Sequence, residues 1–223
     1  MENNIKPNLS QYLLFILLII VGVVLYILIF SKAPAENKSS EASSAASMKN
    51  KKYESMPAMT IDKNKKYTAT LQTRKGDIVI ELFAKETPVT VNNFVFLARE
   101  GFYDGTLFHR IVKGFMIQGG DPLGSGSGGP GYKLDDEKIT RDYKRGIIAM
   151  ANSGPNTNGS QFFIMHKDYD LPKNYVIFGQ VIKGLEVVDV IADVPTTDNG
   201  YKEKSKPTEK ITIDKITINE TSL

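Results

Sequence analysis

Hydrophobic and polar positions divide this chain into three parts, and the first is an apolar run. Residues 12–30 contain no charged side chain, and as a helix these roughly 19 residues would be about 28 Å long, close to the hydrocarbon thickness of a bilayer. The run predicts a transmembrane anchor at 12–30 after a short tail at 1–11. A secretory signal peptide is the alternative, because residues 33–35 (APA) resemble a cleavage site. Signal peptides usually have a shorter apolar core of about 7–15 residues, which favours an uncleaved anchor.

The charges on either side of the apolar run give no clear orientation. Lys6 precedes it, whereas Lys32 and Lys38 follow it together with Glu36 and Glu41. A short tail before a single span and a large domain after it are typical of an exported domain. We therefore expect a single-pass protein of the cell membrane whose folded domain lies on the extracytoplasmic side.

The second part, residues 31–66, is rich in Ser, Ala, Lys, Glu and Asn and shows no apolar periodicity. This composition predicts a flexible, solvated linker. A coil of about 35 residues has an end-to-end distance on the order of 30–35 Å, which would hold a domain clear of the membrane surface.

The third part, residues 67–220, has the pattern of short strands in one folded domain. Residues 67–73 and 77–83 alternate apolar and polar side chains around Arg74-Lys75-Gly76, which predicts a hairpin. Further strands are expected at 107–112, 115–118, 146–151, 161–166, 175–182 and 210–219.

Two helices are expected among these strands. Thr87 and Pro88 suit the cap and the first position of a helix, apolar residues follow at helical spacing, and Gly101 is a suitable stop. A second helix is predicted at 185–192. Many short strands with two helices and Gly-rich turns favour a mainly β fold, a closed antiparallel barrel.

Composition excludes several classes of function. The 28 Lys and Arg residues against 25 Asp and Glu leave a net charge of +3 spread along the chain, so no nucleic-acid partner is expected. The absence of Cys excludes disulfides, thiolate catalysis and Cys-ligated zinc. With His109 and His166 as the only histidines, a His-rich metal site is not expected either.

Two segments carry the remaining chemical information: residues 108–120 (FHRIVKGFMIQGG) and residues 150–163 (MANSGPNTNGSQFF). Each mixes bulky apolar side chains with a few polar ones that do not exchange a proton at neutral pH. An arginine, amides and a cluster of Phe and Met are poorly suited to hydrolysis. They are well suited to holding and twisting a neutral apolar group.

Both segments resemble the cyclophilin family of peptidyl-prolyl cis-trans isomerases, and the resemblance covers residues 66–219. It implies a closed barrel of eight strands with a helix capping each end. It also implies isomerase activity on the Xaa-Pro bonds of proline-containing polypeptides, in a monomeric domain without metal, nucleotide or other cofactor. On a membrane tether, such an enzyme would assist the folding of exported or membrane-proximal proteins.

The resemblance also implies roles for individual residues. Arg110, Phe115 and Gln118 match catalytic positions of the family. The implied substrate-binding residues form the proline pocket, grip the peptide by hydrogen bonds or lie at the rim, and they are His109, Met116, Gly126, Ala151, Asn152, Gln161, Phe163, Leu171 and Tyr175.

Proline isomerisation is rotation about an amide whose resonance sets a barrier of about 18–20 kcal/mol. In the twisted state the prolyl nitrogen becomes pyramidal and gains a lone pair, which the guanidinium of Arg110 can stabilise; it can also hold the adjacent carbonyl oxygen. A turnover near 10³ per second requires the enzyme to lower the activation barrier by about 7 kcal/mol. A charged hydrogen bond contributes only about 1.5–3 kcal/mol of this. We expect the remainder to come from a preorganised, water-poor pocket.

Two departures from the family pattern bear on inhibition. Many eukaryotic members have a Trp just before the residue that matches Leu171, where this chain has Asp170 with Tyr169 beside it. Tyr175 stands where they have a His, and aligning this stretch requires a one-residue gap. Because the Trp hydrogen-bonds cyclosporin in the family, we expect weak cyclosporin sensitivity.

Three motifs have competing interpretations. Residues 124–129 (GSGSGG) match the dinucleotide motif G-x-G-x-x-G, although no helical pattern follows them. Ser160 with a histidine suggests a hydrolase pair, although the sequence lacks a G-x-S-x-G elbow. The acidic run at 135–137 is either a solvated loop or a weak cation site.

The leading function also has rivals. Taken singly, Phe115, Met116 and Phe163 suit an ordinary barrel core, and Arg110 suits a surface salt bridge. The domain could equally bind proline-containing segments as a chaperone without catalysis. A pure binding module has no need of the guanidinium, so the presence of Arg110 favours the enzyme.

Overall fold

The computed structural model describes residues 51–222. The predicted tail at 1–11 and anchor at 12–30 lie outside these residues. Within the described part of the chain, no helix combines the length and apolar character needed to cross a membrane.

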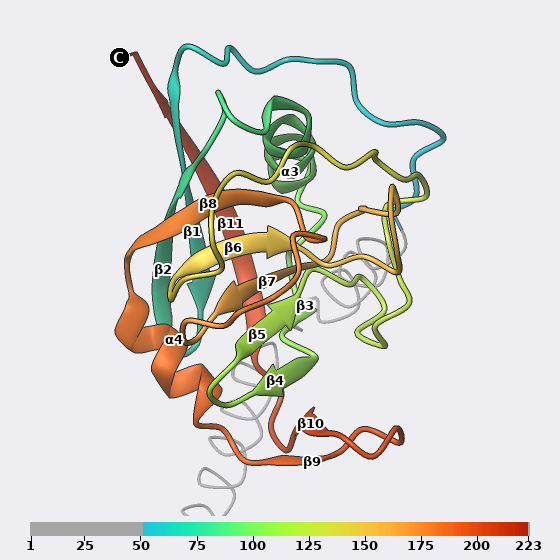
Figure 1. Cartoon of the computed structure of the whole chain (residues 1–223), viewed down its shortest axis with the longest axis vertical. Coiled ribbons are helices and arrows are strands. Elements are labelled where there is room, and N and C mark those ends of the chain that lie inside the picture. The colour runs from blue at the N-terminus through green and yellow to red at the C-terminus, as the bar shows by residue number, and fades with distance from the viewer. Residues whose placement is uncertain (1–50, 223) are drawn as a thin grey trace, which may run out of the picture. The chain divides into compact units, whose positions relative to one another are not determined.

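One curled antiparallel sheet dominates the fold (Figure 1). Its nine strands are ordered β3-β11-β1-β2-β8-β6-β7-β5-β4. Their bounds are β1 Lys66–Thr73, β2 Gly76–Leu82, β3 Thr106–Leu107, β4 Arg110–Val112, β5 Met116–Gly119, β6 Ile147–Met150, β7 Phe162–Met165, β8 Ile177–Lys183 and β11 Thr212–Thr221. A separate small hairpin pairs β9 (Thr196–Asp198) with β10 (Lys204–Pro207).

The predicted closed barrel of eight strands is wrong in both closure and strand number. The sheet is a half-barrel, and its edge strands β3 and β4 are not neighbours in the hydrogen-bonded order. Residues 107–112 were expected to form one strand, but the chain changes partner between Phe108 and His109. Phe108 N–H donates to the Ile211 carbonyl (2.9 Å), whereas His109 N–H donates to the Gln118 carbonyl (3.0 Å). One continuous segment therefore links the two edges of the sheet covalently, without a ladder between them.

The predicted hairpin is confirmed. Strands β1 and β2 pair from Tyr67–Leu82 to Thr73–Gly76, so two residues form the loop. Alternate residues of both strands are buried, as the sequence pattern requires. Gly76 has a φ of +127°, which a side chain at this loop would strain.

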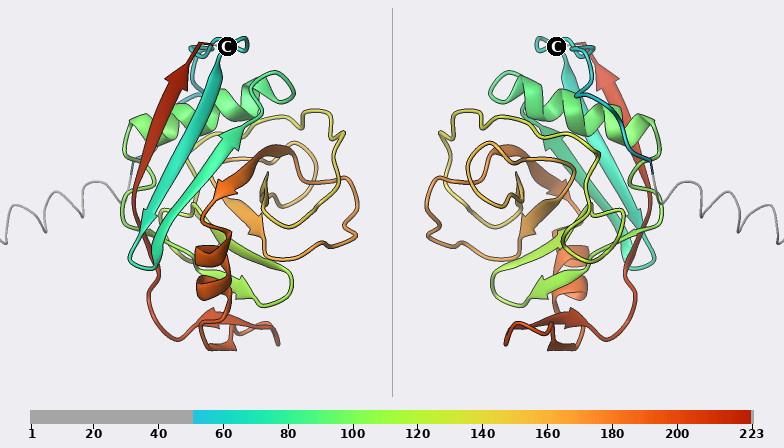
Figure 2. Two further views of the ribbon diagram at one scale, coloured as in Figure 1. Left: turned by 90° about the vertical axis from the view of Figure 1, so that its left-hand side faces the viewer. Right: turned by 90° about the vertical axis from the view of Figure 1, so that its right-hand side faces the viewer.

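The two predicted helices are present as α3 (Pro88–Arg99) and α4 (Leu185–Ala192), and they lie toward opposite ends of the sheet (Figure 2). Pro88 occupies the first position of α3, but the Thr87 side chain makes no capping bond. Glu137 does so instead, because its carboxylate accepts N–H bonds from Val89 (3.0 Å) and Thr90 (2.7 Å). One member of the acidic run therefore caps a helix.

Helix α3 supplies the centre of an aromatic core. The ring of Phe94, fully buried, lies 5.2 Å from those of Tyr103 and Phe178 and 5.8 Å from that of Phe162. Because Phe162 belongs to β7 and Phe178 to β8, this cluster packs α3 against the strands of the sheet.

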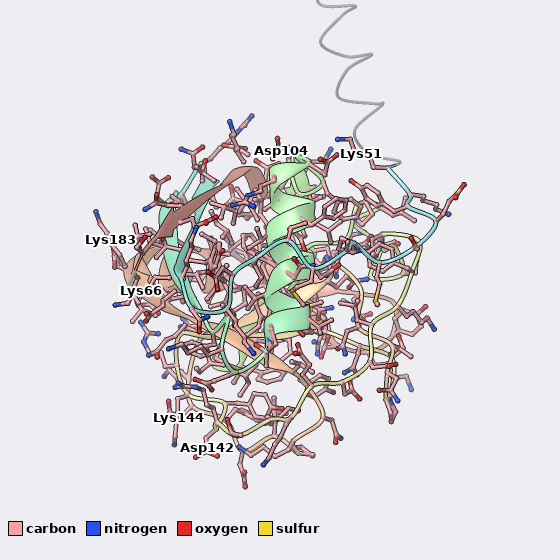
Figure 3. The ribbon with its side chains drawn as sticks, turned by 90° about the horizontal axis from the view of Figure 1, so that it is seen from above. Lys51, Lys66, Asp104, Asp142, Lys144 and Lys183 are labelled. Atoms are coloured by element: carbon pink, nitrogen blue, oxygen red, sulfur yellow. The ribbon has the colours of Figure 1, made fainter. Side chains whose placement is uncertain are left out.

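Residues 51–65, which the sequence assigned to the linker, pass across α3 (Figure 3). The ring of Tyr53 lies 5.2 Å from that of Phe96, and Tyr53 N–H donates to the Pro130 carbonyl (2.8 Å). The Asn92 side chain accepts from Thr60 N–H (2.8 Å) and donates to the Ala58 carbonyl (3.0 Å). The segment is thus in contact with the folded body from Tyr53 onward.

Candidate active site

Strand register brings the two signature segments together in one row. Arg110 pairs with Gln118 between β4 and β5, Gln118 with Phe163 between β5 and β7, and Phe163 with Ala149 between β7 and β6. Residues directly opposite in adjacent strands project from the same face of a sheet. Arg110, Gln118 and Phe163 therefore share a face although they are far apart in sequence.

Alternation separates this face from the main core. The intervening residues Ile111, Ile117 and Ile164 are fully buried in the core that contains Phe94. Met116 and Phe163 belong to a second apolar cluster, against which Phe115 and Leu171 pack while remaining partly exposed. We call Phe115, Met116, Phe163 and Leu171 the apolar cup. The cup residues do not lie in the main core, which argues against reading them as ordinary barrel interior.

The guanidinium of Arg110 lies at the edge of the apolar cup. Its Nη1 donates to Gln118 Oε1 (3.1 Å) and is 3.9 Å from the sulfur of Met116. Its other side forms an ion pair with Glu203, with Nε–Oε2 at 2.8 Å and Nη2–Oε1 at 2.7 Å. Arg110 thus makes the salt bridge that the alternative interpretation expected, but it does so beside an apolar surface.

A chain of side-chain amides continues from Arg110. Gln118 Nε2 donates to Gln161 Oε1 (3.1 Å), and Gln161 Nε2 donates to the carbonyls of Gly126 (3.0 Å) and Gly128 (2.9 Å). Because a guanidinium only donates, Gln118 must present its oxygen to Arg110 and its amide N–H groups to Gln161. The orientation of both amides is therefore determined by Arg110.

The remaining predicted residues gather around this chain. Gln118 and Gln161 line a hollow of about 220 Å³ together with Gly126, Ala151 and Asn152. The Asn152 side chain donates to the Asn174 carbonyl (2.8 Å) and accepts from Gly154 N–H (3.3 Å), so it also serves the local turn.

Aromatic residues extend the wall of the cup. The ring of Tyr175 stands edge-on to that of Phe163, with centroids 5.5 Å apart. The ring of Tyr169 lies 4.6 Å from that of Phe115, a contact that the sequence analysis did not anticipate. The only signal for this contact in the sequence was that Tyr169 precedes Asp170, the position at which many eukaryotic members have a Trp. The weak cyclosporin sensitivity expected from the missing Trp stays a prediction.

His109 lies between Arg110 and the glycine-rich loop. Both of its ring nitrogens are buried and lack a hydrogen-bond partner among residues 51–222. Burial lowers the pKa of His109 below its ordinary value, an effect that the nearby Asp121 carboxylate only partly opposes. The imidazole is thus neutral at pH 7 and forms a wall of the site instead of an acid.

The glycine-rich loop at 124–129 folds around the buried carboxylate of Asp121. That carboxylate accepts N–H bonds from Leu123 (2.8 Å), Ser125 (2.9 Å) and Gly126 (2.5 Å). A dinucleotide site needs such N–H groups free for phosphate, and here the Asp121 side chain, three residues before the loop, occupies them. The dinucleotide interpretation therefore loses its chemical basis.

The loop gives a first testable prediction. Burial alone would raise the pKa of Asp121, but the backbone N–H bonds outweigh it and lower the pKa below its ordinary value. In Asp121→Asn an amide NH₂ group would face these donors, and we expect the free energy of unfolding at pH 7 to fall by about 2 kcal/mol. Urea unfolding measures this, with the exposed Asp135→Asn as a control that should change it little.

The pH dependence of the difference follows from the sign of the shift. The folded pKa of Asp121 lies below the unfolded value of about 3.9, so its stabilisation is fully present above that pH and is lost as the pH falls through the folded pKa. The gap between wild type and Asp121→Asn should therefore narrow below about pH 4. An equal gap at pH 7 and pH 3 would contradict this role of the carboxylate.

Two other motifs have structural roles. The Ser160 hydroxyl is buried and donates to the Gly120 carbonyl (2.7 Å), so it is engaged away from any nucleophilic role. In the acidic run, Asp136 accepts from Asn158 Nδ2 (2.7 Å), while Glu137 caps α3. Among residues 51–222, no group of three or more acidic or histidine side chains is arranged to hold a metal ion.

A groove of about 740 Å³ adjoins the site. Arg110, His109 and Gln118 form one wall of it, and the β9–β10 hairpin with Tyr201 and Ser205 forms the other. The hairpin lies below β4 and β5 in Figure 1. The sequence analysis predicted neither this hairpin nor the contact of Glu203 with Arg110.

Comparison with known proteins gives a family for this fold and site. The model of the cyclophilin-type peptidyl-prolyl cis-trans isomerases matches residues 68–218. The chain is 46% identical over 155 residues to peptidyl-prolyl cis-trans isomerase-like 3 of Gallus gallus, covering 67% of this chain and 94% of that protein. It is also 46% identical over 174 residues to peptidyl-prolyl cis-trans isomerase A of Mycobacterium tuberculosis, covering 68% of this chain and 91% of that protein.

Solved structures agree. A crystal structure of a cyclophilin-type peptidyl-prolyl cis-trans isomerase of Cryptosporidium parvum, determined in the presence of the dipeptide Ala-Pro, superposes with a TM-score of 0.63 at 40% identity. The match covers 68% of this chain and 98% of that one. The chain therefore belongs to the cyclophilin family, and its enzyme class is peptidyl-prolyl cis-trans isomerase.

Proposed function

We propose that this isomerase accelerates rotation about Xaa-Pro bonds in polypeptide substrates by means of Arg110 and the apolar cup. The observation that carries the proposal is the position of the guanidinium, whose Nη1 lies 3.9 Å from the sulfur of Met116 and is held by Gln118 at 3.1 Å. A donor fixed beside an apolar surface is suited to an amide that loses conjugation while its ring stays in place. The dipeptide Ala-Pro present with the Cryptosporidium parvum relative supports a proline-containing substrate.

The proposed mechanism uses no proton transfer. The prolyl ring occupies the cup, and the preceding carbonyl swings about the imide bond. An N–H group of Arg110 donates to the developing lone pair on the imide nitrogen or holds the adjacent carbonyl oxygen. The neutral state of His109 at pH 7 suits this mechanism, because no acid is required.

Exchange NMR on a short Ala-Pro peptide tests the activity. Exchange cross-peaks between the cis and trans forms should appear on the sub-second scale with catalytic amounts of the protein, whereas the uncatalysed exchange takes tens of seconds. Binding of the peptide without accelerated exchange would contradict the proposal and support a non-catalytic chaperone instead.

We further propose that the enzyme works on a membrane tether, where it assists the folding of exported or membrane-proximal proteins. The apolar run at 12–30 and the polar composition that follows support this placement. The domain would lie on the extracytoplasmic side.

Cell fractionation and protease accessibility test this placement. The full-length chain should sediment with membranes and resist extraction by alkaline carbonate. Protease added to intact cells, with the surface exposed, should remove the folded domain while a cytoplasmic marker survives. Recovery of the chain in the soluble fraction would contradict the tether. Protection of the domain until the cells are lysed would contradict the proposed orientation.

A further inference from the structure

The contact between Glu203 and Arg110 joins the candidate active site to a hairpin outside the main sheet. Glu203 lies between β9 and β10, and its two carboxylate oxygens accept from Nε and Nη2 of Arg110 at 2.8 and 2.7 Å. Such a two-point pair fixes the plane of a guanidinium as well as its position, because two parallel N–H···O bonds leave no free rotation.

Glu203 is itself held in place by the hairpin. The Asn199 side chain donates to Glu203 Oε2 (3.3 Å) and to the hydroxyl of the buried Ser205 (3.1 Å). Asn199 N–H also donates to the Glu203 carbonyl (3.0 Å). The carboxylate that holds Arg110 is therefore positioned by the fold of the hairpin and not by its own rotamer preference.

The two sides of the guanidinium are held by different elements. Glu203 occupies Nε and Nη2, and Gln118 occupies one N–H of Nη1. A guanidinium has five N–H donors, so donors remain on its outer edge. One of them faces the Met116 sulfur at 3.9 Å, a weak acceptor that a substrate oxygen or nitrogen can replace. The arrangement leaves free the donors that face the cup.

Stability alone does not account for this pair. The Arg110 and Glu203 side chains are 33% and 37% exposed, and ion pairs with that access to water contribute little to folding. The hydrogen bond from Arg110 nevertheless lowers the pKa of Glu203 to about 2, so the carboxylate is charged throughout the neutral range. Because the arginine side chain is long and flexible, the main effect of the pair is to fix the orientation of its guanidinium.

We propose that Glu203 is a positioning residue, supplied by the β9–β10 hairpin, that fixes the Arg110 guanidinium for proline isomerisation. This inference rests on the proposed role of Arg110. Without Glu203 the guanidinium would sample several rotamers, and only part of the molecules would present a donor to the twisted imide. Binding of the planar substrate in the cup would change little, because Glu203 bonds Arg110 and does not belong to the apolar cluster that contains Met116 and Phe163.

The test compares Glu203→Ala, Glu203→Gln and Glu203→Asp with wild type by NMR line-shape analysis, which separates peptide dissociation from isomerisation on the enzyme. We expect Glu203→Ala to slow the isomerisation step about tenfold while the dissociation constant stays within about twofold. Glu203→Gln, which can accept only one of the two bonds, and Glu203→Asp should fall between Glu203→Ala and wild type.

Glu209→Gln is the matched control. It removes the same charge a few residues further along the chain, where Glu209 pairs with Lys75 (2.8 Å) and not with Arg110. Its isomerisation rate should equal that of wild type. The Arg110 Nε–H signal in a ¹⁵N spectrum gives a second readout, since it should be sharp in wild type and Glu209→Gln and broadened by solvent exchange in Glu203→Ala.

Three results would overturn the proposal. A Glu203→Ala variant that isomerises within twofold of wild type, while Arg110→Ala is impaired, would remove the role of Glu203 and leave the proposed function intact. A faster Glu203→Ala variant would show that the carboxylate competes with the substrate. An inactive wild type would remove the function itself, and this inference with it.

Discussion

Arg110→Ala is expected to lower kcat/KM for an Ala-Pro peptide about a hundredfold, because it removes a charged donor worth about 1.5–3 kcal/mol in the twisted state. The cup residues Met116 and Phe163 remain buried in their own cluster, so the apolar cup should persist. The fold should also persist, since the pair with Glu203 is about one-third exposed on both sides.

A protease-coupled peptide assay or exchange NMR measures this loss, and a thermal melt checks the fold. Arg110→Lys is the informative control, because it keeps the charge but loses the planar fork that bonds Glu203 and Gln118 together. It should retain activity between that of wild type and that of Arg110→Ala. An Arg110→Ala variant within twofold of wild type would mean that another group stabilises the imide.

Gly120→Ala is expected to lower the free energy of unfolding by about 3 kcal/mol or more. Gly120 has a φ of +79°, where a non-glycine residue costs about 1–2 kcal/mol. A Cβ at this position would also overlap the carbonyl oxygen of Ser160 and lie 2.9 Å from Cδ1 of Phe162. The two signature segments approach each other at this point, and a side chain would separate them.

Gly105→Ala is the matched control for the conformational part of this effect. Its φ is +73°, and a Cβ there would meet nothing within 4 Å. Urea unfolding should therefore show a loss of about 1–2 kcal/mol for Gly105→Ala and a clearly larger one for Gly120→Ala. Equal losses in the two variants would show that the segments can move apart at no cost.

Elements with a local signal could be predicted from the sequence. Helix α4 has its predicted bounds, because apolar spacing over 185–192 is unambiguous and Gly184 precedes it. The β1–β2 hairpin has a two-residue loop that its turn residues specify. Both depend on contacts between residues close in sequence.

Features that depend on distant partners were missed. The strand expected at 107–112 divides because Phe108 and His109 bond to opposite edges of the sheet, which no local pattern reveals. The β9–β10 hairpin lies in a polar stretch without alternation, so neither its strands nor the role of Glu203 could be read from it. Tyr53 likewise has no periodic context, although it packs against Phe96.

In the candidate site, too, some features had a sequence signal and others depended on the three-dimensional arrangement. A resemblance of motifs named Arg110, Gln118 and Phe163, and strand register places them in one row. Neither the motifs nor periodicity could show that Arg110 orients Gln118, and Gln118 in turn Gln161, because hydrogen-bond direction depends on the three-dimensional arrangement.

The central claim is that Arg110 stabilises the twisted imide more than its planar forms. Line-shape NMR of one Ala-Pro peptide with wild type and Arg110→Ala tests it most directly, because it yields the dissociation constants of the cis and trans forms and the exchange rate on the enzyme in one experiment. We predict dissociation constants within about threefold of each other and an exchange rate about a hundredfold slower in the variant. A weaker affinity for both planar forms with an unchanged exchange rate would contradict the claim, since Arg110 would then hold the substrate without aiding its rotation.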